Sequence, residues 1–463
     1  MPDPRPLYAH RALLPAGWAS NVAITIDAAG MIETVRQDVP AIPQGAQLLR
    51  GVLVPGIPNC HSHAFQRAMV GLTEVRSSSD DSFWSWRDAM YQLLQQIGPE
   101  QLQAISEQLY IEMLKQGYTS VAEFHYLHHN TDGSVYDDPA EMSHRVIAAA
   151  QSAGIHITHL PVLYCHSDFG GQAAEAGQRR FVHDVDAYQN LLQQLHDRYH
   201  DVPNVQLGMA PHSLRAVSER LLREAVTGLN ALDDSAPIHI HIAEQQREVD
   251  SCIAHSGARP VQWLLQNFDV NRRWCLIHAT HLANEECKDL AASGAVAGLC
   301  PTTEANLGDG LFPAVEYLQA QGRFAIGSDS QVCRDPTEEL RSLEYGQRLF
   351  KQRRVLLVQQ DQPSVGESLL QGAIAGGAQA LGFAEAGVCV GARADLLVLD
   401  DQHPVLYGKD GAAILDSWIF ACNDTPVKDV MVAGQWRVRD GVHPQQEDVA
   451  QRYRQALDFL ARI

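Results

Sequence analysis

The stretch PGIPNCHSH, residues 55–63, places two histidines two positions apart at the end of an apolar run. The run begins at residues 52–54 and leads to Cys60, which predicts a β-strand. Side chains two residues apart lie on the same face of a strand, so His61 and His63 can bind one ion together. Because such a pair is a weak signal alone, its meaning depends on the rest of the chain.

Apolar strands alternate with amphipathic helices after this stretch. Helices are predicted at residues 99–115, 185–199 and 254–266, and this alternation is typical of βα units around a parallel sheet. The eight predicted strands are residues 52–54 leading to Cys60, 118–124, 155–163, 205–210, 238–242, 274–277, 295–299 and 324–326. Eight such units predict the α/β class and a (β/α)₈ barrel of the TIM type, whose active site lies at the carboxyl ends of the strands.

Polar residues follow five of these strands at their carboxyl ends. They are His61 and His63 after the first, His212 and Arg215 after the fourth, His241 and Glu244 after the fifth, His278 after the sixth, and Asp329 after the eighth. Three imidazoles and a carboxylate suit Zn²⁺ or a similar ion, which acidifies a bound water into a nucleophile. A second ion normally needs a bridging lysine or glutamate, and the fourth strand ends without a lysine. The sequence therefore predicts one ion per chain.

Two further histidines are alternatives to His241 as a metal ligand and to His278 as the polarising residue. His239 shares a strand face with His241, and His281 follows His278 closely. We favour His241 as a ligand because it lies nearer the strand end and beside Glu244. For His281 we expect a position at the start of a helix.

Composition and charge restrict the partners of the chain. A formal net charge of −20 argues against binding to nucleic acid or to an anionic membrane. We find no run of about 18 apolar residues that predicts a membrane span, and no secretory signal. Nine cysteines without a CxxC pair indicate reduced thiols. We therefore expect a cytoplasmic protein with a small-molecule substrate.

Two distant motifs resemble the amidohydrolase superfamily. Residues 55–63 are similar to its PGxxxxHxH start, and GARADLLVLD, residues 391–400, is similar to the strand by which such chains re-enter a small β-sandwich. The resemblance implies a catalytic barrel of residues 55–387 and a composite β-sandwich domain of residues 1–54 plus 388–463. For its mononuclear deaminase branch it implies the metal ligands His61, His63, His241 and Asp329, a proton-shuttling Glu244 and a polarising His278.

These groups suggest a mechanism for releasing ammonia from a C=N bond. We expect Asp329 or Glu244 to take the proton of the nucleophilic water. Glu244 would then protonate the departing nitrogen, and His278 would stabilise charge on the attacking oxygen.

Four further segments resemble the formimidoylglutamate deiminase family. They are residues 63–67 (HAFQR), 83–87 (FWSWR), 123–128 (EFHYLH) and 211–215 (PHSLR). In that family the positions that hold the glutamate part of the substrate match Gln66, Arg87, Tyr126, His212 and Arg215. The resemblance implies conversion of N-formimino-L-glutamate to N-formyl-L-glutamate and ammonia in histidine degradation, by a zinc-dependent homodimer. Two arginines can form charge-assisted hydrogen bonds with two carboxylates, which agrees with this substrate.

Several of these residues also have structural explanations. Arg87 can pack on Trp84 or Trp86 as a cation–π pair, and Tyr126 can be a core residue. Glu244 can be a surface carboxylate, and Asp329 can cap a helix. Histidines 125, 128 and 129 are expected to be structural, and Cys60 and Cys300 to be small buried residues.

Three other functions remain open on sequence grounds. A deaminase of a purine, a pterin or a similar heterocycle would use the same ligands, with aromatic residues in place of Arg87 and Arg215. A deaminase of a guanidino acid would keep both arginines. A non-catalytic scaffold of the same fold would be expected to lose metal ligands, which this sequence retains.

Overall fold

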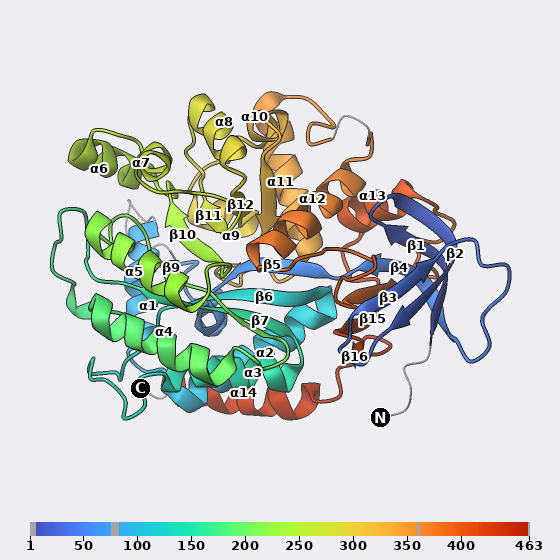
Figure 1. Ribbon diagram of the computed structural model, residues 1–463, viewed down its shortest axis with the longest axis horizontal. Helices are drawn as coiled ribbons and strands as arrows, with labels where there is room; N and C mark the ends of the chain where they lie inside the picture. The colour runs from blue at the N-terminus through green and yellow to red at the C-terminus, as the bar shows by residue number, and fades with distance from the viewer. Residues whose placement is uncertain (1–5, 76–82, 359–361, 462–463) are drawn as a thin grey trace.

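The computed structural model describes residues 6–75, 83–358 and 362–461. A barrel surrounded by helices occupies most of the molecule, and a separate β-sheet lies at its right-hand end in Figure 1. Strands from both ends of the chain, blue and red in Figure 1, meet in that sheet. Of the helices described, none has the length and apolar character needed to cross a membrane.

Parallel strands form the barrel in the order in which they occur along the chain. The strands are β5 (Ile57–Ser62), β6 (Tyr118–His125), β7 (His156–Leu163), β8 (Val205–Leu207) with β9 (Ala210–Pro211), β10 (Ile238–Ile242), β11 (Trp274–His278), β12 (Val296–Leu299) and β13 (Arg323–Ile326). Pairing is parallel from β5 to β8 and from β10 to β13. Parallel bridges from Met209 to Ile238 and from Ser62 to Asp329 join the two groups and close the ring. The predicted (β/α)₈ barrel is confirmed.

Helices cover the outside of the barrel. They are α2 (Pro99–Gln116), α3 (Glu141–Ala153), α4 (Val185–Tyr199), α5 (Glu219–Leu232), α6 (Gln246–Ser256), α7 (Pro260–Asn267), α8 (Asn284–Ser293), α9 (Pro301–Leu307), α10 (Ala314–Gln319), α11 (Pro336–Lys351) and α12 (Val365–Ala380). The predicted helices at 99–115 and 185–199 correspond to α2 and α4. The single helix predicted at 254–266 is wrong, because Gly257, with φ of 78°, ends α6 and Pro260 begins α7.

The remaining helical elements flank the barrel or follow it in the chain. They are the 3₁₀ helices η1 (Ala64–Met69) and η2 (Ala176–Gln178), and the α-helices α1 (Phe83–Leu94), α13 (Ala412–Ala421) and α14 (Gln446–Leu460).

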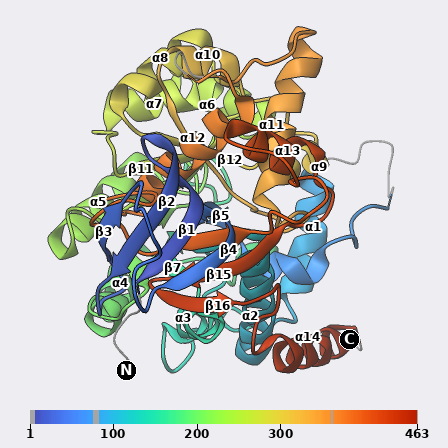
Figure 2. The same cartoon turned by 90° about the vertical axis from the view of Figure 1, so that its right-hand side faces the viewer.

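The second sheet combines the two ends of the chain. Its strands are β1 (Leu7–Leu14), β2 (Gly17–Ile26), β3 (Ile32–Arg36), β4 (Gln47–Pro55), β14 (Leu396–Leu399), β15 (Val427–Val432) and β16 (Gln435–Val438). They lie in the order β16-β15-β14-β4-β1-β2-β3, and Figure 2 shows this sheet from its outer side. β4 pairs in parallel with β1 and antiparallel with β14, so it links the early strands to the late ones.

Alternating residues give this sheet two apolar faces. Val52 and Val54 belong to the large core shared with the barrel, whereas Leu53 packs with Val398 in a separate small core. The chain ends therefore form a composite β domain beside the barrel. The limits 1–54 plus 388–463 for this domain, and 55–387 for the barrel, stay a prediction.

The first predicted barrel strand needs a correction. Residues 52–54 belong to β4 of the seven-stranded sheet, and the barrel strand β5 begins at Ile57. Between the two strands, a Cβ atom on Gly56 would lie 2.4 Å from the Thr119 side chain, and the Gly56 N–H donates to the Asp395 carbonyl over 2.8 Å. One apolar run therefore crosses from one sheet to the other, and hydrophobic periodicity alone does not mark the crossing.

Candidate metal centre and active site

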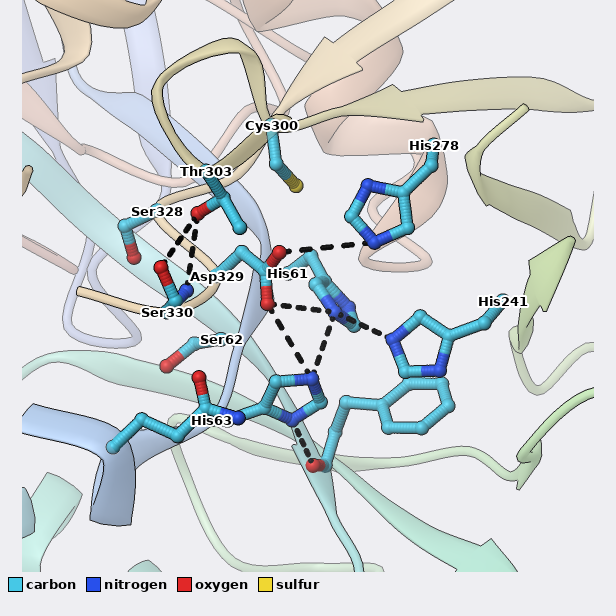
Figure 3. A network of polar contacts seen from close by, with 12 residues as sticks. His61, Ser62, His63, His241, His278, Cys300, Thr303, Ser328, Asp329 and Ser330 are labelled. Carbon is cyan, nitrogen blue, oxygen red and sulfur yellow. Dashed lines mark hydrogen bonds and ion pairs between the residues drawn. The ribbon is translucent and has the colours of Figure 1, made fainter. Parts of the chain in front are cut away.

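Four candidate ligands converge at the carboxyl end of the barrel. His61 lies in β5, His63 just after it, His241 in β10 and Asp329 after β13. Nε2 of His61 lies 3.2 Å from Nε2 of His63 and 3.0 Å from Nε2 of His241 (Figure 3). Oδ1 of Asp329 lies 3.5 Å from Nε2 of His61 and 3.4 Å from Nε2 of His63. Tetrahedral ligands about 2.0–2.1 Å from Zn²⁺ are separated by roughly 3.3–3.4 Å, so His61, His63 and Asp329 fit one such ion, and His241 approaches this group through His61.

The protonation state of these imidazoles also favours a cation. Nδ1 of His63 lies 2.9 Å from the carbonyl oxygen of Phe124, which can only accept, so Nδ1 carries the proton. Nε2 of a neutral His63 then presents a lone pair toward His61 and Asp329. Burial lowers the pKa of His61 to about 3 and lowers the pKa values of His63 and His241. Uncharged imidazoles and a carboxylate therefore meet at one point, as a divalent ion requires.

The carboxylate of the cluster is held in its charged form. Burial opposes ionisation of Asp329, but its hydrogen bond with His61 and the other nearby imidazoles outweigh this effect and hold its pKa below the usual range. Asp329 also has a φ of 45°, and His278 has a φ of 67°. Non-glycine residues seldom adopt such angles, and strain of this kind is concentrated at functional sites.

The buried imidazole of His278 lies beside the four ligands and faces three carboxylates, one of which is Asp329. Nδ1 of His278 lies 3.2 Å from Oε1 of Glu304. Its Nε2 lies 3.8 Å from Oε1 of Glu244 and 3.7 Å from Oδ2 of Asp329. Burial alone would lower the pKa of His278, but the charges of these carboxylates, with Glu244 first, raise it well above the usual value. His278 is thus suited to stabilise negative charge at the site.

Glu244 is buried rather than exposed. It is 6% exposed, and burial raises its pKa to about 7. A carboxyl with this pKa can both accept and return a proton near neutral pH.

The sequence reasoning missed Glu304. This buried residue lies in the first turn of α9, where it accepts hydrogen bonds from Nδ1 of His278 and, over 2.9 Å, from the backbone N–H of Cys300. An acidic residue shortly after the seventh predicted strand was the signal that could have identified it.

The five predicted substrate-binding residues line the same cavity as the cluster. They are Gln66, Arg87, Tyr126, His212 and Arg215. Nε2 of Gln66 donates to the Tyr126 hydroxyl over 3.1 Å. Within the described parts of the chain, Nε of Arg87 and Nε of Arg215 are buried without a hydrogen-bond partner. The cavity therefore presents unused guanidinium donors to a ligand.

The cation–π alternative for Arg87 is present as well. Its Cζ lies 4.7 Å from the ring centre of Trp84, and Cζ of Arg215 lies 5.9 Å from the same ring. A third arginine, Arg247 of α6, contacts this indole at 4.5 Å. The aromatic contact orients the guanidinium groups and does not remove them from the cavity.

The competing histidines lie apart from the cluster. Nε2 of His239 donates to the carbonyl oxygen of Ala380 over 2.8 Å, toward α12. Nε2 of His128 donates to the Val162 carbonyl over 3.1 Å. Residues 6–75, 83–358 and 362–461 contain groups of three or more side chains that are spaced to hold an ion. Each of these groups includes at least one of the four candidate ligands, and none includes His239 or His281.

Comparisons with known proteins identify the family of the chain. The amidohydrolase family model matches residues 52–437, and the model of the N-terminal domain of formimidoylglutamate deiminase HutF matches residues 5–46. The formimidoylglutamate deiminase of Pseudomonas aeruginosa is 54% identical over 454 residues, which cover 98% of this chain and 99% of that protein. The 8-oxoguanine deaminase of the same organism is 26% identical over 412 residues, 87% of this chain and 86% of that protein.

Solved structures show the same fold. An amidohydrolase from Brucella melitensis superposes with a TM-score of 0.93 and 46% identity, covering 99% of this chain and 100% of that one. An adenosine deaminase from Xanthomonas campestris with bound zinc has a TM-score of 0.82 and 22% identity, with full coverage of both chains. The chain belongs to the amidohydrolase family and, within it, to the formimidoylglutamate deiminases.

Proposed function

We propose that the chain hydrolyses N-formimino-L-glutamate to N-formyl-L-glutamate and ammonia. The observation that carries this proposal is the pair of cavity arginines, Arg87 and Arg215, whose buried Nε atoms lack partners within the described residues. Glu175 lies 4.0 Å from Arg87, and the charges of Glu248 and Glu244 act on Arg215, but a buried guanidinium N–H without an acceptor is costly, so a ligand that supplies carboxylate oxygens is favoured. The name of the Pseudomonas aeruginosa relative indicates the same substrate.

Two arginines fit the two carboxylates of this substrate. Each guanidinium can donate paired hydrogen bonds to a carboxylate, and each offsets the negative field of a chain with a net charge of −20. Gln66, Tyr126 and His212 lie in the same cavity and supply further hydrogen bonds. When both carboxylates of the substrate are held, its formimino carbon is directed toward the four candidate ligands, and the entropic cost of alignment is lower.

One Zn²⁺ ion per chain is the proposed cofactor. His61, His63, His241 and Asp329 would hold it, since the donor atoms of His63, His241 and Asp329 lie 3.2, 3.0 and 3.5 Å from Nε2 of His61. The bound ion would act as a Lewis acid that makes a water molecule nucleophilic near neutral pH.

The side chains of the site move the protons of the reaction. Oxygen of the water forms a bond to the formimino carbon while its proton passes to Glu244 or Asp329. Glu244 returns a proton to the terminal nitrogen, the C–N bond breaks, and both protons of the water leave on ammonia. His278 lies 3.8 Å from Glu244 and 3.7 Å from Asp329, a position from which it can stabilise the charge on the attacking oxygen.

Ammonia release from N-formimino-L-glutamate tests the proposal directly. The purified, zinc-loaded protein is assayed with this compound, with a guanidino acid of similar length, and with several aminated purines. We expect the formimino compound to have the highest kcat/KM. A preference for a guanidino acid or a purine would reject the substrate but retain the metal site, and loss of all activity despite bound zinc would support a scaffold.

The biological setting is also a proposal. Family membership supports a cytoplasmic homodimer that acts in histidine degradation. Light scattering of the purified chain tests the dimer, and growth of a deletion strain on histidine as the nitrogen source tests the pathway.

A further inference from the structure

The carboxylate of Asp329 faces two separate groups of donors. Its Oδ1 lies 3.4–3.5 Å from the imidazoles of His63 and His61, which belong to the catalytic cluster. Its Oδ2 points to the other side and lies 3.7 Å from Nε2 of His278 (Figure 3). A carboxylate in this position can bind one ion through each oxygen, as in two-metal sites with ions about 3.5–4 Å apart.

Cys300 completes the donors on the second side. Its thiol, a nitrogen of His278 and an oxygen of Asp329 all lie within 4.8 Å of one another. The three residues come from the ends of the consecutive strands β11, β12 and β13, so the barrel itself brings them together. Figure 3 shows the sulfur of Cys300 close to both His278 and the carboxylate of Asp329.

The hydrogen bonding of His278 determines which of its ring nitrogens faces the second side of Asp329. Nδ1 of His278 interacts with Oε1 of Glu304, so Nε2 is the ring nitrogen that faces Asp329. A carboxylate behind a histidine in this way fixes the ring and strengthens its metal-binding nitrogen. Thiolate, imidazole and carboxylate together favour a soft or borderline ion over Mg²⁺ or Ca²⁺.

We propose that Cys300, His278 and Asp329 form a second, weaker site for a soft divalent ion, such as Cd²⁺ or excess Zn²⁺, beside the catalytic ion. Binding is coordination without electron transfer: the sulfur of Cys300, Nε2 of His278 and Oδ2 of Asp329 bond to the ion, and the thiol proton and the Nε2 proton of His278 pass to solvent. Occupation inhibits hydrolysis because it takes Nε2 of His278 away from the reacting oxygen. This inhibition rests on the proposed function, whereas binding of the ion does not.

The test is a titration of zinc-loaded protein with Cd²⁺. Zinc and cadmium are both counted after equilibrium dialysis, and the cadmium–thiolate charge-transfer band is recorded in the ultraviolet. We expect the wild-type protein to keep its zinc, to take up one cadmium per chain, to develop the band and to lose activity. Cys300→Ser and Cys300→Ala should lose both the additional cadmium and the band. Cys60→Ser is the matched control, since Cys60 is also fully buried in the barrel. Among the described residues, Cys60 belongs to no group of side chains that is spaced to hold an ion.

Three results would overturn the second site. They are no additional cadmium in the wild-type protein, additional cadmium that replaces zinc, and an unchanged band in a folded Cys300 variant. Folding is checked by the melting temperature of each variant, and activity is normalised to the same variant without added ion. Cadmium binding without ammonia release from N-formimino-L-glutamate would reject the proposed function alone, and ammonia release without cadmium binding would reject the second site alone.

Discussion

Oε1 of Glu304 lies 3.2 Å from Nδ1 of His278, so a buried carboxylate determines which nitrogen of this imidazole faces the catalytic cluster. Glu304→Gln keeps the size of the side chain and removes its charge. We expect kcat to fall by about 10–100-fold, the range typical for such supporting carboxylates. KM should change little because Glu304 does not line the cavity. Steady-state kinetics check this, with exposed Glu285→Gln as the control, and an unchanged kcat would exclude a positioning role.

The metal ligands give the second prediction. His241→Ala should lose both the ion and turnover, because its Nε2 lies 3.0 Å from Nε2 of His61 at the centre of the cluster. His239→Ala is the matched control from the same strand, since its Nε2 donates to the Ala380 carbonyl instead. Elemental analysis should find one ion per chain in the fully active wild-type protein. Loss of the ion in His239→Ala alone, or two ions at full activity, would contradict this assignment.

A variant of Glu244 should show that metal binding and proton transfer depend on different residues. Glu244→Gln preserves the shape of the side chain but cannot accept a proton, so the variant should keep its ion and lose ~10²–10⁴-fold in kcat. Metal content and turnover are measured on the same preparation, with Glu285→Gln again as the exposed control. Near-wild-type turnover would remove Glu244 from the mechanism.

Arg215 should determine the choice of substrate. Arg215→Met removes the guanidinium while keeping an unbranched side chain, and it should lower kcat/KM for N-formimino-L-glutamate far more than it changes metal content. In the wild-type protein, formimino-aspartate would misplace one carboxylate and formimino-glycine would lack it, so both should be poor substrates that leave a buried charge unpaired.

The control for this prediction is Arg220→Met, whose side chain is 73% exposed on α5. It should leave kcat/KM unchanged for all three compounds. Indifference of the wild-type protein to the missing carboxylate would defeat the substrate assignment without affecting the barrel or the ion.

The pH dependence of the reaction follows from Glu244. Burial raises its pKa to about 7, so the carboxyl is mostly protonated one unit below this value and mostly ionised one unit above it. Only the ionised form accepts a proton from water, so kcat/KM should rise as the pH increases through neutrality. Metal content is measured at each pH to exclude loss of the ion. A flat or falling profile over this range would contradict the role of Glu244 as the base.

Much of the site was predictable because a barrel obeys a simple geometric rule. Parallel strands end at the same rim, so His61, His241 and Asp329 could be grouped before any contact was known. The strand ends also supplied Glu244 and His278. The position of Glu304 after the seventh predicted strand was also visible, but its pairing with His278 depends on a contact between two different strand ends, which the sequence does not give.

Other features had no local signal. Residues 52–54 and β5 form one apolar run, and only the contacts of Gly56 with Thr119 and Asp395 show that they lie in different sheets. Likewise, the indole of Trp84 contacts Arg215 and Arg247, which lie outside α1. Periodicity describes one element at a time and carries no information on such meetings.

The position of β4 between β1 and β14 has a consequence for synthesis of the protein on the ribosome. β4 leads directly into the strand that carries His61, yet its neighbour β14 is among the last strands to be translated. Until then, one edge of β4 has unpaired backbone groups, which favour association with other chains. We therefore expect the nascent chain to depend on chaperones late in translation, and premature termination before Leu396 to yield aggregates rather than a free-standing barrel.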